Sequence, residues 1–87
     1  MIIKIKGTQV AAPTGSGTAT NVSSATCVRA VNSGTGVRLI TVEESGGTDI
    51  GTFSMPGATV EYIEKNPTDK IFASDAEILL AAVTLKR

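Results

Sequence analysis

The sequence predicts an all-β fold, a compact antiparallel β-sandwich of seven to eight short strands. Threonine, valine and isoleucine are frequent, and these residues favour pleated, half-buried strands. Glycines recur at intervals that separate short apolar segments. Short strands at near-regular spacing, with turn residues between them, are typical of an antiparallel sandwich or barrel. A length of 87 residues indicates one domain, 1–87, near the lower size limit for independent folding.

Each strand is expected where β-favouring residues lie between turn signals. The segments 32–36 (NSGTG) and 45–49 (SGGTD) fit hairpin links. The segment 55–57 (MPG) fits another turn, because proline presets φ and glycine accepts positive φ. The expected strands are 2–6, 8–12, 25–32, 36–44, 49–55, 58–65, 70–74 and 77–86.

The last segment, 76–87 (AEILLAAVTLKR), also admits a helix. Asp75 fits an N-cap, and alanine, leucine and glutamate favour helices. A helix there would carry apolar side chains around much of its circumference. We therefore predict a long strand, preceded by a turn at Ser74 and Asp75.

The segment 11–26 differs from the rest, because it is small and polar, with little to bury before Val22. Its Gly, Ser, Thr and Ala content predicts a flexible surface loop, with a brief strand around 20–23. We expect this loop to become ordered against a neighbouring protein. Pro13, Thr14 and Val22 are therefore candidate partner contacts.

Two predicted strands carry apolar side chains on both faces. In 36–44, residues Val37 and Leu39 point to one side and Ile40 and Val42 to the other. In 77–86, one side carries Leu79, Ala81, Val83 and Leu85, and the other carries Ile78, Leu80 and Ala82. A solvated face should alternate between apolar and polar residues, so such strands are either covered on both sides or meet a partner. A chain this short has little material for a second covering layer. We therefore expect Ile40, Val42, Ile78 and Leu80 at a partner interface.

Residue types exclude several kinds of chemistry. The chain has no histidine and a single cysteine, Cys27, so an internal disulfide, a Cys/His zinc site and a serine–histidine triad are all impossible. Cys27 is expected to be an inert, buried thiol, since no histidine activates it. We predict a protein that is not an enzyme, with no catalytic residues, cofactor or metal.

The segment 61–74 (EYIEKNPTDKIFAS) holds three acidic residues around a proline. Glu61 and Glu64 point to opposite faces of a strand, so they cannot act as an acid–base pair. A calcium site needs more oxygen ligands than this segment offers. We interpret Lys65, Asn66, Pro67 and Asp69 as a structural turn, with an ion pair between Lys65 and Asp69.

Charge and hydropathy limit the partners. Eight basic and eight acidic residues give a net charge of zero without a basic cluster, which disfavours nucleic-acid binding. The longest apolar run, 78–83, is too short to span a membrane as a helix, and the opening IIKIK does not resemble an export signal. We expect synthesis in a cytoplasm and no membrane partner. Zero net charge also removes self-repulsion, which suits a homo-oligomer.

A resemblance rests on several short motifs in residues 28–87. They are Ala30-Val31-Asn32 at a strand end, Thr41-Val42 in the next strand, Pro56-Gly57 in a turn, and IEKNPTDKIFAS at 63–74 before an apolar strand. This pattern resembles small β-sandwich structural proteins of tailed bacteriophages, especially those of marine cyanobacteria. The resemblance does not extend to the 11–26 loop. It implies a location in the virion, at the capsid surface or the tail, and no catalytic residues.

The resemblance leads to two expectations about function. The first is a capsid decoration protein that binds the shell and copies of itself, and that is present in the host cytoplasm during assembly. The alternative is a tail- or fibre-associated module that recognises a host-surface glycan or another virion protein. Tyr62 is the only plausible aromatic platform for a sugar.

Overall fold

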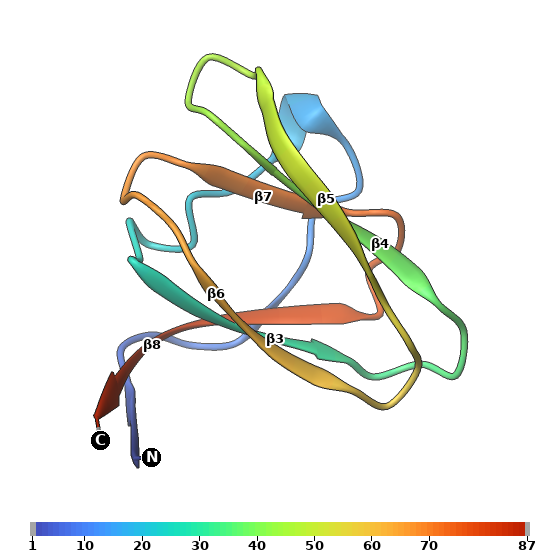
Figure 1. Cartoon of the computed structure of the whole chain (residues 1–87), viewed down its shortest axis with the longest axis horizontal. Helices are drawn as coiled ribbons and strands as arrows, with labels where there is room; N and C mark the ends of the chain where they lie inside the picture. The colour runs from blue at the N-terminus through green and yellow to red at the C-terminus, as the bar shows by residue number, and fades with distance from the viewer. Residues whose placement is uncertain (1, 87) are drawn as a thin grey trace.

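The computed structural model describes residues 2–86, which form an all-β chain (Figure 1). The strands are β1 (Ile2–Ile5), β2 (Val10–Ala11), β3 (Cys27–Asn32), β4 (Arg38–Glu43), β5 (Asp49–Met55), β6 (Val60–Glu64), β7 (Lys70–Ala73) and β8 (Ile78–Lys86), with one 3-10 turn, η1 (Ser16–Thr18). The larger sheet has the order β1-β8-β3-β6, with β2 also paired to β8, and the smaller sheet has the order β5-β4-β7. All pairings are antiparallel. The predicted antiparallel β-sandwich is confirmed.

β8 organises the larger sheet. Its first half pairs with β3 on one side and with β2 on the other, and its second half pairs with β1, where Ile5 lies opposite Val83. In Figure 1, β1 and the end of β8 extend together from the body of the chain as a two-stranded ribbon. The prediction of a strand rather than a helix over 77–86 is therefore confirmed.

The core lies between the two sheets. Along β3 and β7, buried side chains alternate with half-buried ones, as expected for strands with one face against a core. The fully buried apolar residues are Val28, Ala30, Ile40, Met55, Ile71, Ala73, Ile78 and Leu80. Each sheet thus covers the apolar face of the other.

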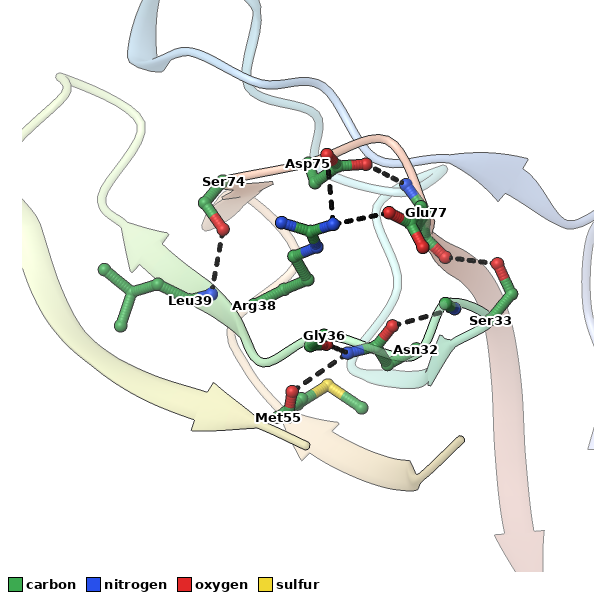
Figure 2. Close-up of polar contacts among 10 residues, drawn as sticks. Asn32, Ser33, Gly36, Arg38, Leu39, Met55, Ser74, Asp75 and Glu77 are labelled. Atoms are coloured by element: carbon green, nitrogen blue, oxygen red, sulfur yellow. Dashed lines mark hydrogen bonds and ion pairs between the residues drawn. The ribbon is translucent and has the colours of Figure 1, made fainter. Parts of the chain in front are cut away.

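Asn32 ties the two sheets together at one end of the sandwich (Figure 2). Its side chain is fully buried at the end of β3. The Nδ2 group donates to the carbonyl oxygen of Met55 at 2.9 Å and to that of Gly36 at 2.8 Å, while Oδ1 accepts from the N–H of Gly34 at 3.0 Å. Since Met55 ends β5 of the smaller sheet, one buried amide links both sheets and the β3–β4 turn.

The 11–26 segment is held by its own chain, so the expectation of a flexible loop is wrong. The N–H of Ala12 donates to the Ile78 carbonyl at 2.8 Å, and the Pro13 carbonyl accepts from the N–H of Ala73 at 2.9 Å. Thr20 forms a bridge with Ile71 through two backbone hydrogen bonds, of 3.1 and 2.7 Å. The outer edge of β7 supplies two of these partners, and it orders a segment whose composition alone favours flexibility.

A left-handed turn carries Val22 into the core. The φ angles of Val22, Ser23 and Ser24 are 52°, 56° and 57°, and the N–H of Ala25 closes the turn on the Asn21 carbonyl at 3.3 Å. Left-handed conformation costs about 1–2 kcal/mol per non-glycine residue. Burial of the Val22 side chain, which is only 5% exposed, helps to offset that cost. The strand expected around 20–23 is reduced to the single Thr20 bridge.

Gly57 lies where a side chain does not fit. A Cβ atom there would stand 2.5 Å from both the carbonyl carbon and the carbonyl oxygen of Thr35. Because backbone atoms cannot rotate away, we expect Gly57→Ala to lower the free energy of unfolding by about 1–3 kcal/mol in urea titrations. Gly46→Ala is the control, because its Cβ would meet no atom within 4 Å. Equal effects of the two substitutions would contradict the packing of Gly57 against Thr35.

Removal of the Asn32 amide leaves the buried Met55 carbonyl and two half-buried backbone groups of the β3–β4 turn without their hydrogen-bond partner. We expect Asn32→Ala to lower the free energy of unfolding by about 2–4 kcal/mol, because each unsatisfied buried group costs about 1–3 kcal/mol. Thermal and urea unfolding measure the change. Thr35→Ala, at an exposed position of the same turn, should change stability by less than about 0.5 kcal/mol. A loss below about 1 kcal/mol for Asn32→Ala would show that the amide does not tie the sheets.

Candidate functional site

The residues predicted at a partner interface on two strands face the core instead. Ile40, Ile78 and Leu80 are fully buried, and Val42 is half-buried and packs against the core cluster. The expectation that these side chains form an open face is wrong, because the second sheet of the same chain covers them. The apolar faces that remain are the opposite sides of the same strands.

The opposite face of β4 is covered in part by the 11–26 segment, while Leu39 on the same face is 43% exposed. Thr41 and Glu43 point away from the core residues of β4, yet they are only 4% and 1% exposed. Ser16 donates from Oγ to Oε2 of Glu43 at 2.8 Å, which places η1 against this face. This segment therefore supplies part of a second covering layer, over Thr41 and Glu43.

The loop residues predicted as partner contacts have different positions. Val22 is buried in the core and Pro13 is half-buried, with its carbonyl bonded to β7. Thr14 is exposed. Only Thr14 therefore presents its side chain fully to the outside.

The opposite side of β8 belongs to an open face of the larger sheet. Residues directly opposite each other on antiparallel strands share a face, so the register defines which side chains lie together. Arg29 lies between Ala81 and Tyr62, and Val31 lies between Leu79 and Val60. We call this surface the outer face; it comprises Ile3, Ile5, Cys27, Arg29, Val31, Val60, Tyr62, Glu64, Leu79, Ala81, Val83 and Leu85.

The outer face is apolar and hollowed by two grooves. Ile5 is 76% exposed, Val60 40% and Ile3 37%, whereas Ala81 and Val83 on the same face are only 8% and 4% exposed. One groove of about 640 Å³ is lined by Ile3, Ile5, Gly7, Thr8, Gln9, Arg29, Ala81 and Val83. A second, of about 450 Å³, is lined by Thr26, Cys27, Tyr62, Glu64, Thr84 and Leu85. Exposed apolar side chains that adjoin grooves make this face the candidate interaction surface.

The alternation in 77–86 signals the two apolar faces without revealing which is the inner one. The alternation assigns one of the two faces to Leu79, Ala81, Val83 and Leu85. The sequence predicts the exposure of Ile3 and Ile5 less clearly, because an apolar strand at the start of a chain is equally consistent with a core strand. The register with β8 places both on the outer face.

The Lys65–Asp69 segment is a turn, as predicted, but its bonds differ from the expected ones. Lys65 donates from Nζ to the carbonyl oxygens of Ala25 at 2.7 Å and Asn66 at 3.2 Å. The Asp69 carboxylate accepts from the N–H of Asn66 at 3.0 Å, so the expected Lys65–Asp69 ion pair is replaced by bonds to the backbone. Burial lowers the pKa of Lys65, and the nearby charge of Asp69 partly opposes this shift. Pro67 is exposed at the tip, and the segment joins β6 to β7.

A second polar cluster, at the start of β4, also has a structural role (Figure 2). Arg38 pairs with Glu77 at 2.5 Å and with Asp75 at 3.6 Å, and Ser74 Oγ accepts from the N–H of Leu39 at 3.0 Å. These contacts hold the β7–β8 turn against β4. Both carboxylates already have a cationic partner.

Cys27 lies on the outer face and is half-buried. Burial, together with the charge of Glu64, raises the pKa of its thiol, which disfavours the reactive thiolate. Within residues 2–86, no three or more Cys, Asp or Glu side chains are grouped so that they could hold a metal ion. The described part of the chain contains no helix that is long and apolar enough to cross a membrane.

Comparisons with protein-family models, with curated proteins and with solved structures find no match for this chain. The outer face is therefore defined by its geometry alone.

Proposed function

We propose that this chain is a non-enzymatic structural protein of a phage virion, of the capsid-decoration kind, that binds the shell surface and copies of itself. The observation that carries the proposal is the outer face, where the exposed Ile3, Ile5 and Val60 lie on one surface with half-buried side chains of β3, β6 and β8. The motifs within 28–87 that resemble phage structural proteins are the reason for proposing a virion as the assembly.

The fold suits repeated weak contacts. A small chain gains limited stability from its own core, and burial of further apolar surface adds about 25 cal/mol per Å². Part of that gain is lost to the ordering entropy of association. On a shell with many identical sites, many such contacts act together and hold each subunit firmly.

A tail- or fibre-associated module that binds a glycan is the second candidate. Tyr62 favours it, because this half-buried aromatic side chain lines the second groove of the outer face. An aromatic ring with one accessible side stacks on the apolar face of a sugar. A glycan array probed with and without added calcium separates this candidate from a decoration protein, which should bind no glycan in either condition.

Copy number in the particle tests the proposed location. We expect quantitative mass spectrometry of purified particles, from the phage whose genome encodes this chain, to find it in numbers comparable to those of the major shell subunit. A decoration protein covers the repeated shell surface, whereas a tail component is present in few copies. Absence from the particle, or only a few copies, would contradict the proposal.

Substitution of one exposed apolar residue tests the outer face. We expect Ile5→Glu to reduce incorporation into particles by about tenfold or more, because it places a charge in the larger groove at the cost of about 1.5–3 kcal/mol of apolar contact. Ile50→Glu is the matched control, since Ile50 is 56% exposed on β5 of the other sheet. Equal melting temperatures would show that both variants fold. Equal incorporation of the two variants would argue against the outer face.

A further inference from the structure

We propose that a second copy of this chain covers the outer face about a two-fold axis, with Arg29 of each copy paired to Glu64 of the other. This inference rests on the proposed function, because it names the first partner of the same surface. It is argued from three features: the two charges on the face, their arrangement, and the apolar surface around them.

The outer face carries one charge of each sign. Arg29 is half-buried on β3 and Glu64 is exposed at the end of β6. Neither forms an ion pair within residues 2–86, where both ion pairs found belong to Arg38. The remaining side chains of the outer face are apolar or neutral. Arg29 lines the larger groove and Glu64 the smaller one.

This arrangement is complementary to itself. In a two-fold interface the same patch meets its own copy, so a residue that contacts a second residue is contacted by it in return. A cation and an anion at different points of one face then form two equivalent ion pairs across the axis. A charge buried at an interface without a partner is costly, which requires an anion opposite Arg29. Glu64 of the second copy meets that requirement.

The apolar surface around the two charges is suited to the same partner. Two sheets that pack face to face bury their facing side chains in a layer about 10 Å thick. A stable interface buries about 800 Å² on each partner, roughly a sixth of the 4933 Å² that this chain exposes. The exposed Ile3, Ile5 and Val60 belong to the face that would supply this area. Zero net charge adds no repulsion between the copies.

Native mass across a concentration series tests the inference. We expect light scattering to show the wild-type chain at twice the mass of a single chain. Arg29→Glu and Glu64→Arg should each weaken the dimer by about tenfold or more, because each opposes like charges at both pairs. Glu44→Arg, an exposed charge reversal in the β4–β5 turn, is the matched control and should leave the dimer intact. Melting curves of each variant show whether it is folded.

Mixing the two variants gives the decisive result. A chain with Arg29→Glu and a chain with Glu64→Arg place opposite charges at both pairs, so an equal mixture should recover the mass of a dimer. The double variant should also dimerise. If charge reversal unfolds the chain, Arg29→Ala and Glu64→Gln should still weaken the wild-type dimer.

Three outcomes overturn the inference. A wild-type chain that stays monomeric at high concentration, a closed trimer, or single variants that dimerise as well as the wild type would each exclude the two-fold contact. None of these results depends on whether the chain is found in a virion. Failure of the dimer and failure of the proposed function are therefore measured separately.

Discussion

The buried Asn32 amide is the interaction on which the arrangement of the two sheets depends. It ends β3 in the larger sheet, and its hydrogen bonds reach Met55 at the end of β5 and the turn that leads into β4. Its backbone also pairs with Thr59 and Ala58, within the link between β5 and β6. A buried amide without these partners would be strongly destabilising. The arrangement of the sheets that satisfies all of these bonds is therefore favoured.

Once the sheets are fixed, the 11–26 segment completes the smaller one. Its backbone binds the edge of β7, Ser16 bonds Glu43 on the outer side of β4, and Val22 enters the core. A chain that lacks a disulfide and a large core gains stability from each of these contacts. The outer side of the smaller sheet is consequently covered at Thr41 and Glu43, whereas Leu39 and the outer side of β5 remain exposed.

The outer face of the larger sheet is covered only in part by the described residues, which bury Ala81 and Val83 but leave Ile3, Ile5 and Val60 exposed. This face combines exposed isoleucines at β1 with two unpaired charges, Arg29 and Glu64. Burial of this exposed apolar surface against a partner would be thermodynamically favourable. The outer face is therefore the surface on which exposed apolar side chains and one charge of each sign lie together.

The sequence alone determined the fold class, nearly all strands and the turns, because alternation and turn residues act locally. It also determined that β8 has two apolar faces. Only the tertiary structure decided that Ile78 and Leu80 face inward while Leu79 and Leu85 face outward, because a pattern of period two is unchanged when its faces are exchanged. The order of the 11–26 segment was likewise decided by β7, whose free edge lies about 50 residues away along the chain.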